Sequence, residues 1–439
     1  MKIPEKAPVV TDLYNVSDSD LKELFHMNSG QTDEAGKFRQ LVRLFNGSDY
    51  IHWDNLRRKQ LPYDPKLVWL FLKIQRGHYF HTIRIGKGVF RYIILEKFQK
   101  ELHNIDKASP ASFEWLPGEA PSETDKRRYL INSLMEEAIA SSQLEGAATT
   151  REVAKKFLRE GKKPKNKSEQ MILNNYRTIQ TLHTLKSQPL TGELIRNIHQ
   201  EITKGTLESE QDEVEFRDSN DIAVHDKRDP SIKYYHPPDF TEIPDLINGL
   251  CLFTNNEEEF IHPIIKGIII HFLVGYIHPF NDGNGRTARA LFYWFVLKHR
   301  YDLFEYLSIS RIFVHAPMRY TLAYLLTETD ENDMTYFIDF NIDIISKAME
   351  DLKQYIIEKR KEELDSIQLV EQIPDITFRQ ADILKEFITR PSRRVTVNEI
   401  AGKFKISLPT ARSDLVRLEE MGKIKAIKDG IRFIYVYNG

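Results

Sequence analysis

Residues 278–289 have the sequence HPFNDGNGRTAR, and they follow directly on the apolar stretch IIKGIIIHFLVGYI at residues 264–277. With about 14 residues, one lysine and one histidine, this stretch is too short and too polar to cross a bilayer, and it predicts a buried helix. The proline and glycines that follow end that helix, and a second helix is expected to start near Gly285. Two helices joined by a polar loop therefore decide the fold, which we expect to be mostly α-helical.

The loop between these helices has the composition of a phosphate-binding turn. Gly283 and Gly285 flank Asn284, so the backbone can adopt dihedral angles that point successive N–H groups to one side. Such groups at a helix N-terminus, together with the helix dipole, favour an anion. Arg286 and Arg289 lie three residues apart on one face of the second helix, where their guanidinium groups can bind phosphate oxygens in a fixed geometry.

Three further residues of this segment have expected roles. Asp282 offers a hard carboxylate, and Mg²⁺ prefers one or two such oxygens together with phosphate oxygens. His278 lies just upstream and can act as a general base near neutral pH. Phe280 is expected to pack into the core and hold the loop. The alternative interpretation is a purely structural turn, but such a turn has no need of two arginines beside Asp-Gly-Asn-Gly.

The segment closely resembles the signature of the Fic family, His-x-Phe-x-(Asp/Glu)-Gly-Asn-Gly-Arg-x-x-Arg, with every fixed position filled. Fic proteins are mostly adenylyltransferases, which move AMP from ATP to a hydroxyl side chain of a target protein. The resemblance implies that His278 deprotonates a Ser, Thr or Tyr hydroxyl of the target or of the chain itself. It also implies that Asp282 holds Mg²⁺ and that the substrate ATP is bound by Asp282, Gly283, Asn284, Gly285, Arg286, Thr287 and Arg289.

Gly285 separates two kinds of relative. Relatives of the Doc type, which transfer phosphate, carry Lys at this position, so the sequence favours transfer of a nucleotidyl group. The residues do not identify the nucleotide, because UTP, GTP or CDP-choline would fit the same phosphate-binding loop.

A second motif, Ser141-Ser-Gln-Leu-Glu145-Gly146, resembles the inhibitory motif (Ser/Thr)-x-x-x-Glu-(Gly/Asn) of many Fic proteins. Its position is similar to that in the subclass whose inhibitory helix precedes the signature in the same chain. By this resemblance Glu145 pairs with Arg289 and competes with the γ-phosphate of ATP, so that the enzyme is autoinhibited. Two alternatives stay open: an ordinary helix end, and a Glu145 that positions water for the removal of AMP from a modified target.

Short extended runs between residues 216 and 238 predict a β-hairpin inside the helical domain. This hairpin corresponds in position to the flap of Fic proteins, which holds an extended segment of the target beside the active site. Candidate nucleotide contacts on it are Lys233, Tyr234 and Tyr235, although ordinary strand packing accounts for the tyrosines equally well. Tyr320 and Tyr324 fall where relatives contact adenosine, and a place in the core accounts for both equally well.

The length of 439 residues exceeds what one hydrophobic core usually holds, about 250–300 residues, so two or three domains are expected. A Pro- and Ser-rich linker at residues 104–123 marks the first boundary. We predict an N-terminal helical extension at 1–105, a Fic catalytic domain with its inhibitory helix at 106–360, and a winged helix-turn-helix at 361–439.

The C-terminal prediction rests on local signals. A capping box opens a helix at Thr396, Ser407 caps a second helix, and Asp429-Gly430 is a strong hairpin turn. From Phe378 onward there are thirteen Lys and Arg against seven Asp and Glu, whereas the whole chain has a net charge of −2.

A basic winged helix is typical of DNA-binding proteins, and Arg412, Ser413 and Arg417 lie on the expected recognition helix. The alternative function is therefore a DNA-binding regulator whose Fic core senses nucleotide. Winged helices also serve in protein docking and dimerisation, so a homo-oligomer stays open as well.

Composition bounds the remaining classes. The single cysteine, Cys251, excludes an internal disulfide and a Cys-rich zinc site and indicates a reducing compartment. The N-terminal sequence MKIPEKAP lacks the apolar core of a signal peptide. The balance of 62 Lys and Arg against 64 Asp and Glu gives no global attraction to a membrane or to nucleic acid. We therefore expect a cytoplasmic protein with no membrane contact.

Overall fold

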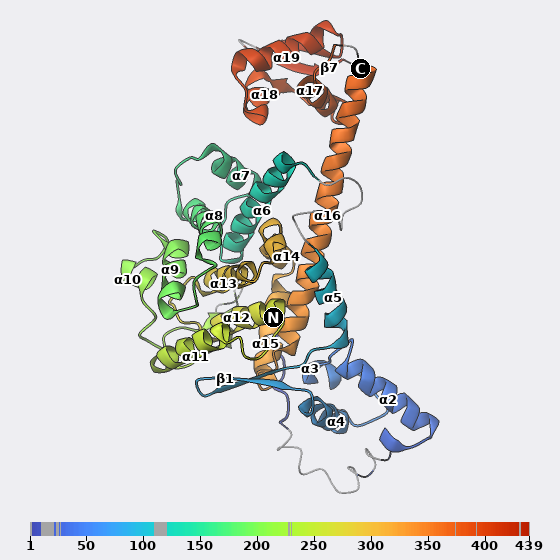
Figure 1. Cartoon of the computed structure of the whole chain (residues 1–439), viewed down its shortest axis with the longest axis vertical. Helices are drawn as coiled ribbons and strands as arrows, with labels where there is room; N and C mark the ends of the chain where they lie inside the picture. Colours follow the sequence, from blue (N-terminus) through green and yellow to red (C-terminus); the bar gives the residue numbers. More distant parts are fainter. Residues whose placement is uncertain are drawn as a thin grey trace. The chain divides into compact units, whose positions relative to one another are not determined.

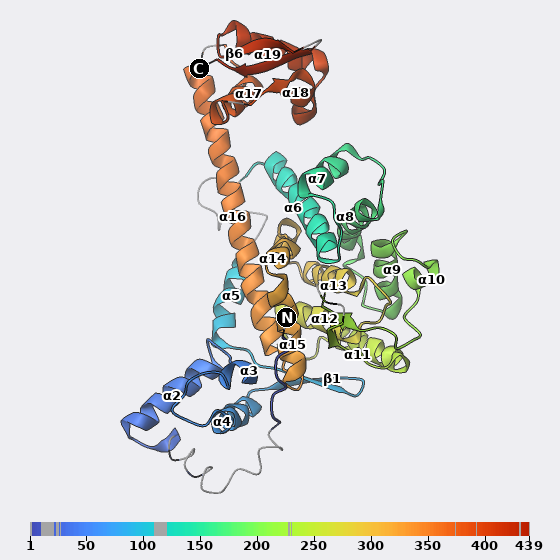
Figure 2. The ribbon, with the colours of Figure 1, turned by 180° about the vertical axis from the view of Figure 1, so that it is seen from behind.

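The computed structural model describes residues 2–9, 22, 26, 28–108, 121–226, 229, 231–373, 375–391, 393–429 and 432–438. Contacts divide the chain into two compact units, Met1–Leu352 and Lys353–Gly439 (Figures 1 and 2). Helices dominate the described residues and the strands are few and short, so the predicted mostly α-helical fold class is confirmed. Most of the linker expected at residues 104–123 lies outside the described residues.

The centre of the first unit is a pair of helices, α12 (Pro263–Ile277) and α13 (Asn284–Lys298), which pack against each other. The predicted buried helix is confirmed, because α12 is buried along nearly its whole length. A Cβ added to Gly267 would lie only 3.2 Å from Val296 Cγ1, so the absence of a side chain there allows the close approach of the two helices. The surrounding helices are α6 (Glu123–Leu144), α8 (Lys167–Leu185), α9 (Gly192–Thr203) and α11 (Ile243–Asn255).

The N-terminal part of this unit is helical apart from one hairpin. Phe38, Phe45 and Trp69 are fully buried members of its own apolar cluster. The hairpin packs on α11, where Gly249 has no side chain to hold Ile85 away. The elements are α2 (Asp33–Asn46), α3 (Trp53–Leu56), α4 (Pro65–Gly77), β1 (His81–Ile85), β2 (Gly88–Tyr92) and α5 (Glu96–Lys107).

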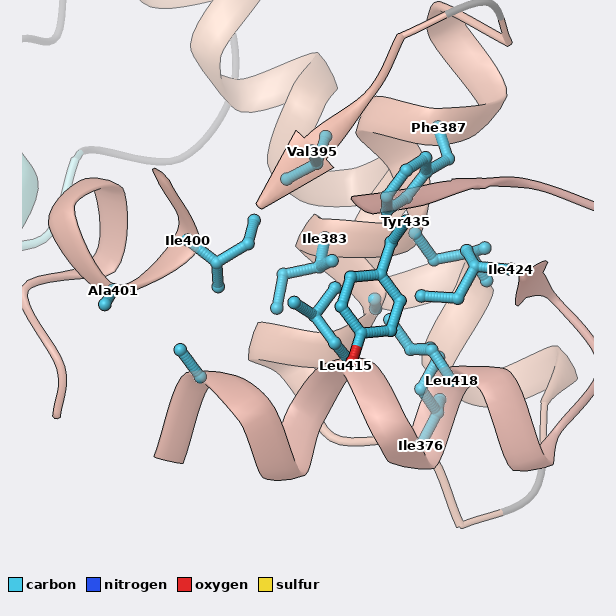
Figure 3. Close-up of a cluster of buried hydrophobic side chains, with 13 residues drawn as sticks. Ile376, Ile383, Phe387, Val395, Ile400, Ala401, Leu415, Leu418, Ile424 and Tyr435 are labelled. Carbon is cyan, nitrogen blue, oxygen red and sulfur yellow. The ribbon is translucent and has the colours of Figure 1, made fainter. Parts of the chain in front are cut away.

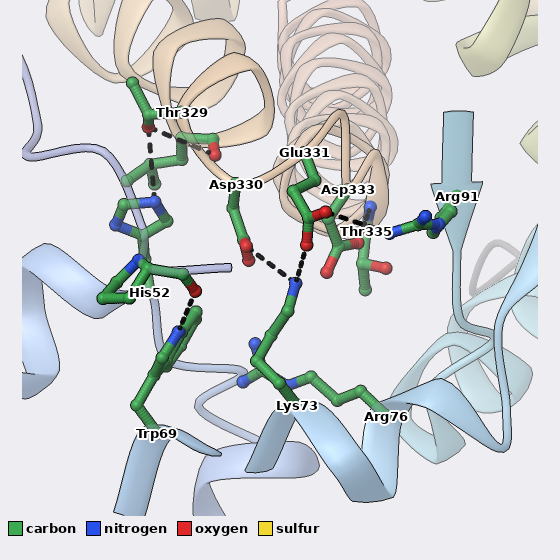
Figure 4. Close-up of polar contacts among 12 residues, drawn as sticks. His52, Trp69, Lys73, Arg76, Arg91, Thr329, Asp330, Glu331, Asp333 and Thr335 are labelled. Carbon is green, nitrogen blue, oxygen red and sulfur yellow. Dashed lines mark hydrogen bonds and ion pairs between the residues drawn. The ribbon is translucent and has the colours of Figure 1, made fainter. Parts of the chain in front are cut away.

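A buried ionic cluster joins these N-terminal helices to the turn between α15 (Pro317–Thr329) and α16 (Thr335–Gln372) (Figure 4). It consists of Lys73, Arg76, Asp330 and Asp333, and we call it the closed cluster. The Lys73 ammonium lies 2.7 Å from an Asp330 carboxylate oxygen, and both side chains are at most 3% exposed. Arg76 donates to two backbone carbonyl oxygens at 2.9 Å each. Because buried charges are tolerated only when paired, this cluster fixes the position of α15 and the start of α16.

The predicted β-hairpin is confirmed as a short antiparallel pair, β3 (Val224–His225) and β4 (Lys233–Tyr235). Within the described parts of the chain, no helix is both long enough and apolar enough to cross a membrane. The remaining elements of the unit are α7 (Arg151–Glu160), α10 (Glu210–Val214), η2 (Phe240–Glu242), η3 (Asp302–Tyr306) and α14 (Ile309–His315).

The second unit contains a small domain with its own apolar core (Figure 3). The capping box at Thr396 is present, with Glu399 as its second member. The buried carboxylate of Asp414 accepts hydrogen bonds from Arg379 and Gln380 and so ties two of the helices together. After the C-terminal part of α16, the elements are α17 (Phe378–Thr389), β5 (Val395–Thr396), α18 (Val397–Phe404), α19 (Leu408–Glu420), β6 (Ile424–Asp429) and β7 (Arg432–Tyr437), and the strand order is β5-β7-β6.

Candidate active site

His278 ends helix α12 in an unusual conformation. Its backbone is left-handed, with φ 49° and ψ 57°, which costs roughly 1–2 kcal/mol for a residue with a side chain. Its Nδ1 lies 3.3 Å from the carbonyl oxygen of Gly275. Because a carbonyl oxygen only accepts, Nδ1 carries the proton and Nε2 keeps its lone pair. Burial lowers the pKa of His278 below its usual value, so the ring is neutral at pH 7.

The side chain of Asn284 holds the loop after His278 in shape through hydrogen bonds to the loop backbone. The Asn284 amide accepts from the Phe280 backbone N–H at 2.9 Å and donates to the Phe280 carbonyl at 2.7 Å. Phe280 itself is fully buried, as predicted, and its ring stacks on that of His199 at 3.6 Å. The side chain of Asn284, a predicted ATP contact, is thus used to shape the loop, and only its backbone N–H remains for a ligand.

Helix α13 begins directly after this loop, and Gly283 caps it with φ 83°. The first N–H groups of a helix have no partner within the helix, so a helix start of this kind favours an anion. A Cβ at Gly283 would lie 2.6 Å from Thr203 Cγ2, which leaves glycine as the residue that fits. The Thr287 hydroxyl, another predicted contact, is fully buried and donates to the Gly283 carbonyl at 3.0 Å.

Two buried guanidinium groups lie on the first turns of α13. Arg286 is 2% exposed and Arg289 is 3% exposed. Arg286 Nε and Arg289 Nη1 have no hydrogen-bond partner within the part of the chain that the structure describes. A buried donor without a partner costs about 1–3 kcal/mol, so these two nitrogens are suited to hydrogen bonds with an anion.

Asp282 is the solvent-facing carboxylate of the site. Its side chain is 58% exposed, and one oxygen lies 3.7 Å from Arg286 Nη2. Its backbone carbonyl contacts His199 Nε2 at 2.9 Å. An exposed carboxylate beside an anion-binding helix start fits Mg²⁺, which takes few protein oxygens when phosphate supplies the rest.

Helix α6 brings Glu145 to the same place. The Glu145 carboxylate lies 2.9 Å from Arg289 Nη2, and Arg289 also donates to the Ser141 hydroxyl and carbonyl, both at 3.0 Å. A Cβ added to Gly285 would lie 2.3 Å from Glu145 Oε1, so the carboxylate lies directly on the first turn of α13. Gly146 follows with φ 96° and ends the helix. We call Glu145, Asp282, Arg286 and Arg289 the open cluster.

The remaining predicted contacts have other partners here. Lys233 is exposed on β4, and the Tyr234 hydroxyl donates to Asp226. The Tyr235 hydroxyl donates to the Tyr276 carbonyl at 3.0 Å. The Tyr320 hydroxyl lies 2.7 Å from His271 Nε2, within an aromatic cluster that also includes Tyr324, Phe313, Phe337 and Phe340.

Two residues outside the sequence motifs hold the loop in place. His199, from α9, is fully buried beneath it and contacts the carbonyl oxygens of Glu213 and Asp282. Arg217 donates from Nε to the His278 carbonyl at 2.9 Å. Neither was predicted from the sequence, because each lies more than 60 residues from its loop partner, His278 or Asp282. The signal that the sequence did offer was a histidine on the apolar face of a predicted helix.

These features define a class of site: a helix start suited to an anion, a neutral histidine in the loop before it, and a glutamate that follows a separate helix and pairs with one of the arginines. Residues 189–296 match the Fic/DOC family, and residues 379–435 match the DeoR-like helix-turn-helix domain. The chain therefore carries a Fic/DOC domain followed by a DeoR-like helix-turn-helix domain.

Similar proteins carry the same family name. The chain is 32% identical over 101 residues to the protein adenylyltransferase Fic of Nematostella vectensis, covering 20% of this chain and 22% of the relative. It is 29% identical over 86 residues to that of Aedes aegypti, covering 17% of each. The match thus spans less than a quarter of these relatives. The structure of Fic-1 (residues 134–508) from C. elegans shares the fold, with a TM-score of 0.51 at 14% identity over 79% of this chain and 94% of that one.

Proposed function

We propose that the chain transfers AMP from ATP to a Ser, Thr or Tyr hydroxyl of a target protein and of itself, and that Glu145 restrains this activity. One observation carries the proposal: two buried guanidinium groups with unpartnered nitrogens among the described residues lie at a helix N-terminus, on the loop that begins with His278. The names of the relatives, protein adenylyltransferase, support the same reaction.

His278 acts as the base in this proposal. Its Nε2 takes the proton of the hydroxyl as the hydroxyl oxygen forms a bond to the α-phosphorus, and the bond between that phosphorus and the bridging oxygen breaks. Pyrophosphate leaves with the electron pair. A positioned base of this kind contributes about 10²–10⁴-fold to the rate. Arg286, Arg289 and the N–H groups of the first turn of α13 stabilise the negative charge that spreads over the phosphates.

Asp282 is the residue that would hold Mg²⁺. Its 58% exposed carboxylate leaves room for a cation that also binds phosphate oxygens. Bound there, the ion would offset part of the charge of the triphosphate. No other residue is needed for that role in the proposal, since Mg²⁺ keeps several waters.

Glu145 restrains the reaction by competition. Its carboxylate pairs with Arg289, which in this proposal is the partner of the γ-phosphate. The same carboxylate lies against Gly285, so in this proposal its negative charge is next to the bound phosphates. The carboxylate and a phosphate group would repel each other strongly at close range, because the site is partly shielded from water. ATP would therefore bind in a pose that does not react until Glu145 moves away.

The flap and Tyr320 contribute to substrate binding in this proposal. Lys233 is exposed on the hairpin and carries a positive charge, while Tyr234 and Tyr235 keep the hairpin folded through their hydroxyls. An extended segment of the target would pair with the hairpin. Adenosine contact by Tyr320 requires that its hydroxyl exchange the bond to His271 for one to the base.

The test is self-labelling with α-labelled ATP and Mg²⁺. We expect Glu145→Gly to label strongly, Glu145→Gln to label at an intermediate level because it keeps a hydrogen-bond acceptor without the charge, and the wild type to label weakly. Glu145→Gly combined with His278→Ala should lose at least about 100-fold of the signal.

Parallel reactions with α-labelled UTP, GTP and CTP identify the donor, and release of AMP from labelled protein measures the reverse reaction. Equal labelling of the double variant would contradict the role of His278.

The C-terminal domain supports a second function, DNA binding. Arg412, Ser413 and Arg417 are exposed on α19, while Ala411, Leu415 and Leu418 on its other side are buried in the core. A basic exposed face on the second helix of a helix-turn-helix is typical of a recognition helix. Anisotropy of labelled duplex DNA titrated with the full chain should show binding that weakens steeply with salt and is reduced in Arg412→Ala/Arg417→Ala. Absence of binding at low salt would leave protein docking as the role of this domain.

A further inference from the structure

Arg217 is a buried cation whose hydrogen bonds all go to the backbone or to an amide. It lies between α10 and β3 and is 4% exposed. Its Nε donates to the His278 carbonyl at 2.9 Å, and its backbone N–H donates to the Pro279 carbonyl at 2.9 Å. Two consecutive residues of the loop that carries the proposed base are thus bonded to one arginine.

The other end of the same guanidinium holds the flap. Nη1 donates to the Ser219 carbonyl at 2.8 Å, before strand β3, and Nη2 donates to the Pro238 carbonyl, after strand β4. Asn220 adds two further hydrogen bonds where the two ends of the hairpin meet. It donates to Asp239 at 2.7 Å and accepts from the Phe240 backbone N–H at 2.9 Å. Both ends of the hairpin therefore meet at Arg217.

Only arginine can make this set of bonds. The planar guanidinium presents five N–H donors in a fixed fork, whereas the ammonium of lysine places its three donors on one nitrogen. His278 has a left-handed backbone, a conformation that persists only where the surroundings fix it. The bond from Arg217 to the carbonyl of that residue is one of the contacts that do so.

We propose that Arg217 is a positioning residue: it holds His278 in its left-handed conformation and ties it to both ends of the flap, so that the base and the surface receiving the target keep one relative position. This inference rests on the proposed transfer reaction. Arg217 has no role with the phosphates, since its bonds lie on the His278 and flap side of the loop and the anion-binding groups lie on α13.

The experiment compares Arg217→Gln and Arg217→Lys in the Glu145→Gly background. Since a misplacement of about 1 Å can cost about 100-fold in rate, we expect the maximal self-labelling rate to fall by about that factor in both variants. The ATP concentration for half-maximal labelling should change by less than about threefold, because ground-state binding of ATP is untouched. Recovery of the rate in Arg217→Lys would show that charge alone matters and would overturn the proposal.

A second measurement, the rate of proteolysis in the hairpin, reports how firmly the flap is held. Trypsin cleaves after the exposed Lys233, and the initial rate of that cut, followed by mass spectrometry, should rise by about tenfold or more when the base of the hairpin is loosened in Arg217→Gln. Asn220→Ala, at an exposed position, should give a smaller rise and a smaller loss of labelling. The matched control is Arg196→Gln, whose guanidinium lies 5.2 Å from the Phe216 ring in the same region and which should change neither readout.

The two proposals fail in different ways. If Glu145→Gly does not label at all, the transfer reaction is wrong, and the cut at Lys233 still reports whether Arg217 holds the flap. If Glu145→Gly labels but Arg217→Gln labels equally fast with an unchanged cut, the positioning role is wrong. A loss of labelling in Arg217→Gln with no change at Lys233, and a lowered unfolding temperature, would also overturn it.

Discussion

Two clusters of charged residues, each with buried cations, lie in the same unit of this protein, and they differ in how completely those cations are hydrogen-bonded. In the closed cluster, Arg76 donates to four different acceptors, among them Asn46 and Tyr336. Lys73 is paired with Asp330 (Figure 4). In the open cluster, Arg286 and Arg289 each keep a nitrogen without a partner among the described residues.

The difference separates a cluster whose charges serve the fold from one whose nitrogens are suited to a ligand. Burial alone would raise the pKa of Asp330, yet Lys73 and Arg76 outweigh it and the pKa lies below its usual value. All the charge in this cluster is used to hold helices together. An unpartnered buried donor gives the fold nothing and costs stability, so it is retained where a ligand completes the bonds.

The largest expected effect is a loss of stability when the closed cluster is broken by substitution of Lys73. Lys73→Met leaves the Asp330 carboxylate buried without its cation, which should lower the free energy of unfolding by about 3–5 kcal/mol. Arg286→Met, at an equally buried position of the open cluster, should lower it by no more than about 1 kcal/mol, because few bonds are lost. Urea unfolding of the full chain, followed by tryptophan fluorescence, measures both losses, since Trp69 lies beside Lys73 and Trp294 is on α13 with Arg286. Equal losses in the two variants would remove the distinction between the clusters.

The next effect concerns His52, which lies at the edge of the closed cluster. Its Nδ1 accepts the Asp54 N–H at 3.1 Å and its Nε2 contacts the Thr329 hydroxyl, and burial lowers its pKa to about 4. The unfolded chain binds this proton near pH 6.5, so stability is full above that pH and should fall by roughly 3 kcal/mol as the pH drops to 4. His52→Asn keeps an acceptor for Asp54 and should lack this part of the pH dependence. Parallel unfolding curves for the two proteins would contradict it.

The local structure around the open cluster could be predicted from the sequence because most of it comes from one short segment. The loop, the start of α13 and the burial of Phe280 all follow from twelve consecutive residues, in which two glycines, a carboxylate and two arginines together favour an anion-binding turn. Glu145 lies 144 residues from Arg289, and only its resemblance to a known motif connected the two. Asn284 shows the limit of such reasoning, since spacing cannot tell whether an amide faces a ligand or its own loop.

The closed cluster was not predicted at all. Lys73 and Asp330 are 257 residues apart, and each is an ordinary charged residue in its local sequence. His199 and Arg217 escaped for the same reason, because their bonds to the loop depend on how distant helices pack. Periodicity predicts which face of a helix is buried, but it does not predict which charges meet there.

A smaller effect is expected on ATP affinity when Arg286 of the open cluster is substituted. Arg286→Met should weaken ATP binding by about 10–100-fold, the value of hydrogen bonds to a charged group. Calorimetry on the Glu145→Gly/His278→Ala protein measures binding without turnover. Lys298→Met is the matched control, since Lys298 lies at the other end of α13 and donates to the Gln188 carbonyl. A Kd that is unchanged in Arg286→Met would show that this arginine does not bind phosphate.

The smallest effect is a shift in the pH dependence of self-labelling. Burial lowers the pKa of His278, Arg217 lowers it further, and Glu145 and Asp282 raise it. Labelling by Glu145→Gly should therefore be constant from pH 7 to 8 and should decline only below the ordinary histidine value near 6.5. The wild type, which keeps the Glu145 carboxylate, should have its midpoint at a higher pH than Glu145→Gly. Because the base must be neutral to accept a proton, a midpoint above pH 7 in Glu145→Gly would mean that a group other than a buried, neutral His278 limits the reaction.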